Sequence, residues 1–373
     1  MIIVVGSGLA AYTFVQELRR HSKEIPITMV TKDCGRYYLK PPLSSLERSN
    51  KPLSKVIMGS VADMKEKLNI TIKPFQTVTV IHRNNKSLEL SSGEVIQYQN
   101  LVLALGAEPI HFNSNSSPTR INSLTDYEKV AENWQSMKSI TIVGSGLIGT
   151  EFACDLSKKH HVTWLSRSPY PLEGIVLPKM GNLMKDVLAK EGVDFISGDV
   201  ESIDQHEGRW YLSTANKKVV SDAVLMAIGL KPSIGLAIEA GIKCNKGICV
   251  NQYGQTNDPH VYALGDCAEV CDQWHAYVSP LRLSAMSIVK TLMGSLTKIE
   301  WPAFPVMLKT PLLPTVVCLH PTISACHKDW VLEMTDQGAK ATLSVDGILM
   351  GFMLMGSFVA ERANLIKKVP KFL

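Results

Sequence analysis

The 373-residue chain has eight cysteines but no Cys-x-x-Cys pair. Enzymes that reduce disulfides through a dithiol need two neighbouring thiols, so the sequence disfavours this class. The cysteines are instead expected to be reduced, structural thiols of a cytoplasmic protein. Redox chemistry, if the chain performs any, must therefore come from a bound cofactor or from a single thiol.

Long hydrophobic runs and a strong net charge are also lacking. The apolar stretch Ile348–Ala360 falls short of the ~20 residues that a membrane-spanning helix needs. No leader precedes the first predicted strand, which starts at residue 2, so we expect a cytoplasmic location. The net charge of +5 disfavours a dedicated nucleic-acid-binding protein and is compatible with an acidic protein partner.

The beginning of the chain has the pattern of a strand, a tight turn and a helix. Four apolar residues, Ile2–Val5, predict a buried strand, and Gly6, Gly8 and Ala11 follow with the G-x-G-x-x-G/A spacing. Gly6 permits the turn, Gly8 lets the backbone approach a diphosphate, and the small Ala11 lets helix and strand pack closely. The free N–H groups at the helix N-terminus would hold the diphosphate. The stretch therefore predicts a dinucleotide-binding fold.

The same pattern occurs again in the middle of the chain, with Gly144, Gly146 and Gly149 at the same spacing. Each copy is later followed by a similar octamer, VLALGAEP at residues 102–109 and LMAIGLKP at residues 225–232. The repeat predicts an α/β protein with two Rossmann-like dinucleotide-binding domains, each with three layers around a parallel sheet. Two nucleotide sites in one chain indicate electron transfer between two cofactors.

Both copies lack the acid that usually follows the second strand and holds the ribose hydroxyls. In the first copy Thr31 and Lys32 occupy this place, with Asp33 close behind. The ribose contact then falls either to Thr31 and backbone groups or to Asp33. In the second copy the residues are Ser166 and Arg167. Arg167 is either an exposed loop residue or a partner for a 2′-phosphate, so NADP(H) is not excluded beside NAD(H).

Glu151 and Lys40 each have both an ordinary and a functional interpretation, whereas Lys309 has only an ordinary one. Glu151 lies near the start of the second glycine-rich helix, where an acid commonly offsets the helix dipole, but this turn also faces the space where nicotinamide and flavin would meet. Lys40 precedes the rigid Pro41-Pro42 turn, which holds it either in solvent or near a flavin or phosphate. Lys309 precedes another proline turn and, by its position alone, is a surface lysine.

Asp266 follows a predicted strand end in the sequence YALGDCAE, residues 262–269. A carboxylate at such a turn can accept hydrogen bonds from a chain of sugar-like hydroxyls, and after two nucleotide folds this motif favours FAD. A helix predicted over Leu281–Met293 would point its N-terminus towards the flavin and favour negative charge on the reduced ring.

The last part of the chain is rich in proline and then in predicted strands. Asp346-Gly347 predicts a hairpin turn, and a final helix is predicted over Phe358–Lys368, so this part is expected to be a small α+β cap domain. The predicted domains are an FAD-binding domain of residues 1–110 and 228–300, an NAD(P)-binding domain of residues 111–227, and a cap of residues 301–373.

Several of these motifs together resemble those of rubredoxin reductases, and almost as closely those of flavorubredoxin reductases. The matching segments are GSGLAAY at residues 6–12, YYLKPPLS at 37–44, GSGLIGTEFA at 144–153, YALGDCAE at 262–269 and Lys309-Thr-Pro. Both groups belong to the family of flavoproteins with two dinucleotide-binding domains, which also includes oxygenase-coupled ferredoxin reductases. The resemblance covers essentially the whole chain and implies an FAD domain, an NAD domain inserted within it, and a C-terminal cap.

The resemblance also implies a set of FAD contacts. Those at the diphosphate would be Ser7, Gly8, Leu9 and Ala10, next to Gly6. Those at the adenosine would be Thr31, Lys32 and Val78. Those around the flavin and its ribityl arm would be Lys40, Glu151, Asp266, Val278 and Lys309. The chain departs from its relatives at Ala11, where a glycine is commoner, and at Ser45, where related ferredoxin reductases have a lysine.

The resemblance implies an enzyme that takes hydride from NAD(P)H through FAD and passes single electrons to rubredoxin, which would feed alkane hydroxylation or oxygen reduction. Alternative acceptors are flavorubredoxin, in nitric oxide reduction, and ferredoxin. Less favoured alternatives are an NADH oxidase that uses Cys34 alone and a non-enzymatic FAD and NAD signalling protein similar to apoptosis-inducing factor. Because the flavin supplies the chemistry, no catalytic side chain and no metal are expected.

The expected partner is rubredoxin or a similar small acidic iron protein, and the chain is expected to be a monomer or a homodimer. A basic docking rim would consist of Lys40, Arg48, Lys51, Lys55, Lys367, Lys368 and Lys371. Ordinary surface cations are the alternative interpretation. A docking rim predicts an electron-transfer rate that falls with salt, because salt screens electrostatic steering.

Overall fold

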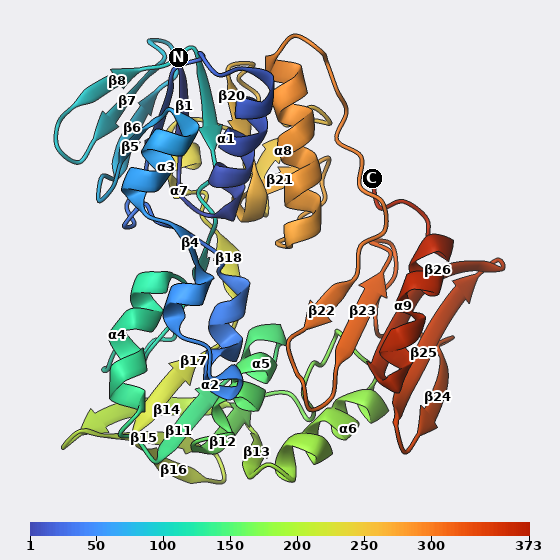
Figure 1. Cartoon of the computed structure of the whole chain (residues 1–373). Helices are drawn as coiled ribbons and strands as arrows, with labels where there is room; N and C mark the ends of the chain where they lie inside the picture. Colours follow the sequence, from blue (N-terminus) through green and yellow to red (C-terminus); the bar gives the residue numbers. More distant parts are fainter.

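The computed structural model describes all 373 residues and contains two units of similar design and a smaller third unit (Figure 1). The first unit is built on a parallel sheet of five strands in the order β20-β9-β1-β2-β5. These strands are β1 (Ile2–Val5), β2 (Ile27–Val30), β5 (Thr71–Lys73), β9 (Asn100–Leu103) and β20 (Val261–Ala263).

Alternate residues of β1 enter two separate cores, as expected for a strand with both faces covered. Ile2 and Val4 belong to the core shared with three helices, α1 (Leu9–His21), α3 (Val61–Leu68) and α8 (Val278–Leu292). Ile3 and Val5 belong to the core shared with an antiparallel sheet of β6 (Val78–His82), β7 (Ser87–Leu90) and β8 (Val95–Gln97). The first unit therefore has the three predicted layers.

The second unit repeats this plan on a parallel sheet of four strands in the order β13-β12-β11-β17. They are β11 (Ser139–Val143), β12 (His161–Ser166), β13 (Val193–Ser197) and β17 (Ala223–Met226). One face shares a core with α4 (Leu124–Trp134), α5 (Leu147–Leu156) and α6 (Pro178–Ala189). The other face packs on an antiparallel sheet of β14 (Val200–His206), β15 (Arg209–Thr214) and β16 (Lys218–Ser221).

The chain crosses between the two units on a pair of antiparallel strands. The two strands are β10 (Ala107–Pro109) and β18 (Leu230–Pro232), and residue 107 pairs with residue 232. Each strand is the end of one of the two similar octamers, so the repeated segments lie side by side where the chain leaves the first unit and returns to it.

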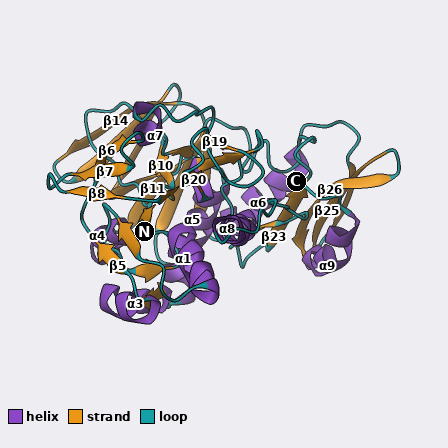
Figure 2. Cartoon of the chain, turned by 90° about the horizontal axis from the view of Figure 1, so that it is seen from above, coloured by secondary structure: helices purple, strands orange, loops and turns teal.

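The third unit is an antiparallel sheet of five strands in the order β22-β23-β26-β25-β24, set beside the other two units (Figures 1 and 2). Its strands are β22 (Val306–Leu308), β23 (Thr315–Leu319), β24 (Val331–Thr335), β25 (Gly338–Val345) and β26 (Ile348–Gly356). Met353 and Met355 enter the core of the second unit, whereas Phe352 and Leu354 enter that of the first, so this sheet packs against both.

The hairpin predicted at Asp346-Gly347 is confirmed, since these residues join β25 and β26. The final helix predicted over Phe358–Lys368 is mostly wrong. The structure has two 3-10 turns there, Ser357–Glu361 and Ile366–Lys368, on either side of the single α-turn α9 (Arg362–Leu365). Phe358 and Ile366 pack against the core of the first unit, and this packing outweighs helix propensity.

Short elements fill the remaining connections. The strands among them are β3 (Tyr37–Tyr38), β4 (Ile57–Gly59), β19 (Ile248–Val250) and β21 (Ala268–Val270). The helices are α2 (Leu46–Ser49), α7 (Gly235–Glu239) and the 3-10 turns Pro41–Ser45, Leu53–Val56 and Gly265–Cys267. None of the helices in the chain combines the length and apolar character of a membrane span.

Candidate dinucleotide and flavin sites

The turn between β1 and α1 has the geometry that the glycine spacing predicts. Gly6 has a φ of 118°, and a Cβ atom there would lie 2.2 Å from the carbonyl oxygen of Ala104, so only glycine fits. At Gly8, the N-cap of α1, a Cβ would meet no atom within 4 Å, and no side chain caps the helix. Open space beside uncapped N–H groups at a helix N-terminus fits a bound diphosphate.

The turn between β11 and α5 repeats this geometry. Gly144 has a φ of 107°, and a Cβ there would lie 2.4 Å from the Ala227 carbonyl oxygen. Gly146 borders open space at the uncapped start of α5. A Cβ at Gly149 would lie 2.0 Å from the carbonyl oxygen of Gly144, whereas the corresponding Ala11 of the first turn is accommodated and fully buried. The second turn is therefore the tighter of the two.

A pair of hydroxyl groups stands at each place where an acid is usually found. In the first unit Ser7 Oγ lies 2.9 Å from Thr31 Oγ1, and in the second Ser145 Oγ lies 2.6 Å from Ser166 Oγ. In both units the backbone N–H two residues further on donates a hydrogen bond of 3.1 Å to the hydroxyl at the strand end. These hydroxyls fix the loop that follows the second strand, and neither carries a charge.

The cations that follow these hydroxyls differ in their surroundings. Lys32 is exposed and its Nζ lies 3.0 Å from Oε1 of Glu108, a hydrogen bond that lowers the pKa of this carboxyl group. Arg167 is exposed too, but no carboxylate lies within salt-bridge distance of it. Asp33, the alternative ribose partner in the first unit, accepts hydrogen bonds from the Tyr38 hydroxyl and a backbone N–H.

The turn of the YALGDCAE motif lies against the first glycine turn. Gly265 has a φ of 80°, and a Cβ there would lie 2.7 Å from Ala10 Cβ, so the two motifs meet at van der Waals contact. The half-buried carboxylate of Asp266 has no hydrogen-bond partner in the protein, and burial raises its pKa. An unpartnered acceptor beside the diphosphate turn fits the hydroxyl chain of a ribityl arm.

Lys40 and Asp266 form an electrostatic pair without contact. The charge of Lys40 opposes the rise in the pKa of Asp266, and Asp266 in turn is the leading charge that opposes the fall in the pKa of Lys40 caused by burial. No salt bridge joins the two, and Lys40 Nζ donates instead to Oδ1 of Asn122, a residue that the sequence did not single out. The groups present therefore fit FAD, with opposite charges near its polar arm.

Val278 is the first residue of α8, whose start lies three residues before the predicted Leu281. This apolar residue is 41% exposed, and no side chain caps the helix. An exposed apolar group beside uncapped N–H groups suits an aromatic ring with carbonyl oxygens. Val78, in contrast, is buried in β6 within the core, so only its backbone is available to an adenine.

Glu151 lies in the second turn of α5 and is almost completely buried, so dipole compensation at the helix start does not account for it. Its carboxylate accepts a hydrogen bond of 2.9 Å from the backbone N–H of Lys309 and one of 2.5 Å from Lys309 Nζ. Ser44 Oγ also donates to it, at 2.5 Å. The three residues come from the second unit, the third unit and the proline turn of the first, so this contact joins all three units.

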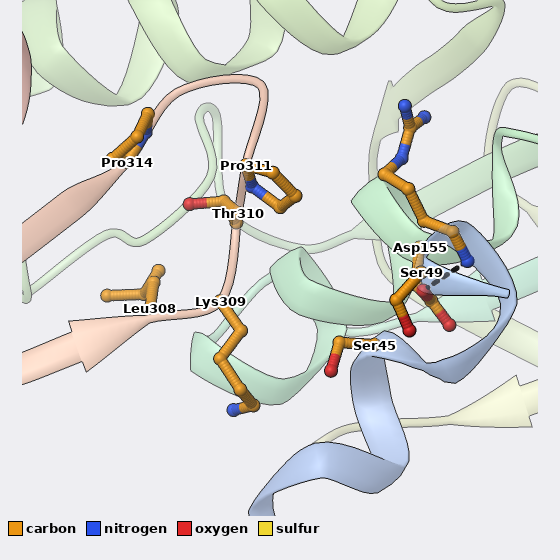
Figure 3. Close-up of a pocket in the computed structure, with 9 residues that line it drawn as sticks. Ser45, Ser49, Asp155, Leu308, Lys309, Thr310, Pro311 and Pro314 are labelled. Atoms are coloured by element: carbon orange, nitrogen blue, oxygen red, sulfur yellow. Dashed lines mark hydrogen bonds between the residues drawn. The ribbon is translucent and has the colours of Figure 1, made fainter. Parts of the chain in front are cut away.

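A cavity of about 670 Å³ opens next to this contact (Figure 3). Figure 3 shows Lys309, Thr310 and Pro311 on one side and Ser45, Ser49 and Asp155 on the other. Sequence reasoning missed Asp155, which accepts hydrogen bonds from the backbone N–H groups of Glu47 and Arg48. Burial outweighs these bonds and raises the pKa of Asp155 to about 6.

All eight cysteines are free thiols. Cys34 is half-buried, and its Sγ accepts a hydrogen bond of 3.3 Å from Nε of Arg36. The guanidinium of Arg36 also forms two hydrogen bonds with Glu128, at 2.8 and 2.7 Å. Cys34 therefore lies in the loop after β2, next to Asp33, and its thiol is held by Arg36.

Two family models together match most of the chain. Residues 1–279 match the model described as pyridine nucleotide-disulphide oxidoreductase, and residues 298–369 match the one described as rubredoxin binding C-terminal domain. The chain belongs to the pyridine nucleotide-disulphide oxidoreductase family. The predicted fold class and the prediction of an oxidoreductase enzyme are confirmed, with FAD and NAD(H) as the cofactors that this family implies.

Curated relatives match over nearly their full length. The rubredoxin-NAD(+) reductase of Alcanivorax borkumensis is 36% identical over 99% of this chain and 98% of its own. The nitric oxide reductase FlRd-NAD(+) reductase of Aliivibrio fischeri is 31% identical over the same shares. The predicted resemblance to rubredoxin reductases, with flavorubredoxin reductases nearly as similar, is thus confirmed.

Known structures share the fold at lower identity. NADH:rubredoxin oxidoreductase from Clostridium acetobutylicum has a TM-score of 0.84 and 20% identity, over 99% of this chain and 94% of its own. The ferredoxin reductase of the CYP199A2 system from Rhodopseudomonas palustris has a TM-score of 0.88 and 20% identity, over 99% and 95%. These structures support the arrangement of two dinucleotide-binding units and a third C-terminal unit.

Proposed function

We propose that this chain is a flavoprotein reductase that takes hydride from a reduced nicotinamide nucleotide and passes electrons to rubredoxin. The observation that carries the proposal is the contact of Glu151 with Lys309, because it joins the second glycine-rich helix to a C-terminal unit that matches the rubredoxin-binding model. This contact lies where nucleotide, flavin and partner protein would meet.

The proposed division of the chain follows its sheets. Residues 1–110 and 228–300 form the FAD-binding domain, residues 111–227 the NAD(P)-binding domain and residues 301–373 the cap. The first parallel sheet supports this, since its strands come from residues 2–103 and 261–263. The crossing strands β10 and β18 lie at the proposed boundaries.

The proposed FAD contacts extend along the first unit from α1 to α8. They are Gly6, Ser7, Gly8, Leu9 and Ala10 at the diphosphate, Thr31, Lys32 and Val78 at the adenosine, and Lys40, Glu151, Asp266, Val278 and Lys309 at the flavin and its arm. FAD, when bound, supplies hydride acceptance and one-electron donation, which no side chain of the protein can. The uncapped N-terminus of α8 and the ammonium of Lys309 would stabilise negative charge on the ring.

The nucleotide is proposed to lie on the second unit, against Gly144, Gly146 and Gly149, with Arg167 near its adenosine. The open space at Gly146 and the uncapped start of α5 support this placement. The protein's own part is to orient the nucleotide relative to the flavin and to exclude water, so its residues act through position and charge.

The proposed partner is rubredoxin, in a cytoplasmic protein that is a monomer or a homodimer. The exposed cations of the predicted docking rim are Lys51, Lys55, Lys367, Lys368 and Lys371. Lys40 and Arg48 do not belong to this rim. Lys40 is half-buried and donates to Asn122, and Arg48 donates hydrogen bonds to Cys154, Ser157 and Glu191.

Flavorubredoxin is the second candidate acceptor, favoured by the 31% identity to a flavorubredoxin reductase over 99% of the chain. Stopped-flow reduction of the flavin-loaded protein, followed by mixing with oxidised rubredoxin or with the rubredoxin-like domain of a flavorubredoxin, separates the two candidates by rate. Full activity of Cys34→Ser would exclude the single-cysteine oxidase. Reduction of neither iron protein would contradict the proposed function.

A further inference from the structure

The two dinucleotide-binding units hold their ribose-side loops in the same way. A serine of each glycine turn contacts the hydroxyl at the end of the second strand, at 2.9 Å in the first unit and 2.6 Å in the second. A cation follows directly in both, Lys32 and Arg167. Because the two loops are built alike, the surroundings of Lys32 can be compared directly with those of Arg167.

The two cations differ in whether their charge is compensated. Lys32 is neutralised by Glu108, whose carboxylate lies 3.0 Å from its Nζ. Arg167 is exposed and has neither a salt bridge nor a side-chain hydrogen bond within the protein. The adenosine of FAD carries no 2′-phosphate and needs no extra cation, whereas the adenosine of NADPH carries a phosphate at that place.

Ser166 also lacks the carboxylate that usually binds the ribose 2′-hydroxyl of NAD(H). A carboxylate at this position would accept hydrogen bonds from the ribose hydroxyls and would repel a 2′-phosphate. The Ser166 hydroxyl is neutral and already contacts Ser145 Oγ at 2.6 Å and the Ser168 N–H at 3.1 Å. Since a hydroxyl has one donor and two acceptor positions, a single position is left for a ligand.

We propose that the second unit selects NADPH, with the guanidinium of Arg167 bound to the 2′-phosphate of its adenosine. A guanidinium presents planar N–H donors that match phosphate oxygens, and the neighbouring hydroxyl of Ser168 has no side-chain partner in the protein. The inference deepens the proposed function, on which it rests, and separates this chain from relatives that are named for NAD(+).

Direct binding tests this inference without turnover. The probes are adenosine 2′,5′-bisphosphate and AMP, which differ only in the 2′-phosphate, titrated calorimetrically into the flavin-loaded protein. We expect the bisphosphate to bind about 10- to 100-fold more tightly, as for a charge-assisted contact, and to lose more of its affinity with added salt than AMP does.

Two variants at exposed positions then test whether Arg167 causes the difference in affinity between the two probes. Arg167→Ala should remove most of the difference between the two probes. Lys217→Ala, which removes one positive charge from the exposed turn between β15 and β16, should preserve the difference. Equal affinities of the unaltered protein for both probes, or an equal loss for both on Arg167→Ala, would overturn the inference.

Flavin reduction separates this inference from the proposed function. If neither NADH nor NADPH bleaches the flavin, the proposed function fails. If NADH bleaches it and the two adenosine probes bind equally, only the preference for NADPH fails. Faster bleaching by NADPH, together with tighter binding of the bisphosphate, would support both.

Discussion

The carboxylate of Glu151 accepts hydrogen bonds from both nitrogen atoms of Lys309, which lies 158 residues further along the chain. Glu151 is almost completely buried, with a side chain 4% exposed, whereas the side chain of Lys309 is 33% exposed. A buried carboxylate without a partner is unfavourable, so the contact couples the placement of α5 to that of the third unit.

Lys309→Met should lower the free energy of unfolding by about 2–4 kcal/mol, because it leaves Glu151 buried without its cation. The value lies towards the low end for buried pairs, since water reaches the Lys309 side chain. Urea denaturation measures it. Lys340→Met is the matched control: its partner Glu361 is 41% exposed, and the expected loss is about 0–1 kcal/mol.

Glu151→Gln introduced together with Lys309→Met should recover part of this stability, because a neutral amide replaces the uncompensated charge. A double variant less stable than Lys309→Met alone would show that the charge of Glu151 is satisfied by other groups. If Lys309→Met and Lys340→Met lowered the free energy of unfolding equally, the contact with Glu151 would contribute no more than an exposed salt bridge.

Adding a methyl group at Gly149 should affect ligand binding much more than removing one at Ala11, the corresponding position of the first glycine turn. Gly149→Ala places a Cβ 2.0 Å from the Gly144 carbonyl oxygen, so α5 must shift and nucleotide affinity should fall at least tenfold while FAD is retained. Ala11→Gly should keep both ligands and cost about 1 kcal/mol of stability. Nucleotide titration and flavin content measure these effects, and unchanged nucleotide binding by Gly149→Ala would contradict the assignment of the second turn.

Asp155 should make stability fall as pH rises. Burial raises its pKa from 3.8 to about 6, so between these values the folded protein binds a proton that the unfolded chain has released. The contribution of Asp155 to the free energy of unfolding is fully present below pH 4 and is lost by about pH 7. The loss is on the order of 2–3 kcal/mol. Asp155→Asn should flatten this part of the curve measured by urea denaturation, and parallel curves for the two proteins would contradict the raised pKa.

Asp266→Ala should weaken FAD binding about tenfold or more, because its unpartnered carboxylate is the proposed acceptor for the ribityl arm. Asp266→Asn keeps one acceptor oxygen and should lose less. Release of flavin fluorescence on dilution measures both affinities. Retention of FAD by Asp266→Ala at the level of the unaltered protein would remove Asp266 from the site.

The parts of the fold that depend on local pattern were predictable from sequence. The glycine turns follow from the positive φ that Gly6 and Gly144 adopt, and the hairpin follows from Asp346-Gly347. The start of α8 was placed three residues late, because Pro280 suggests a boundary but is tolerated in the first turn of a helix.

The contacts that build the candidate site were less predictable because they join distant segments. The sequence marked both Glu151 and Lys309, but nothing local indicated that they would pair, and Lys40 proved to contact Asn122 instead. Asp155 could not be recognised from the sequence, because its carboxylate accepts hydrogen bonds from backbone N–H groups of α2, more than 100 residues away.

Electron transfer from the reduced flavin to rubredoxin decides whether this chain is a rubredoxin reductase. The flavin-loaded protein would be reduced with one equivalent of nucleotide in a stopped-flow instrument and mixed with oxidised rubredoxin at increasing salt. We expect rapid reduction of rubredoxin, with a second-order rate constant that falls as salt screens the exposed lysines. Flavin that is reduced by nucleotide but passes no electrons to rubredoxin at any salt concentration would contradict it.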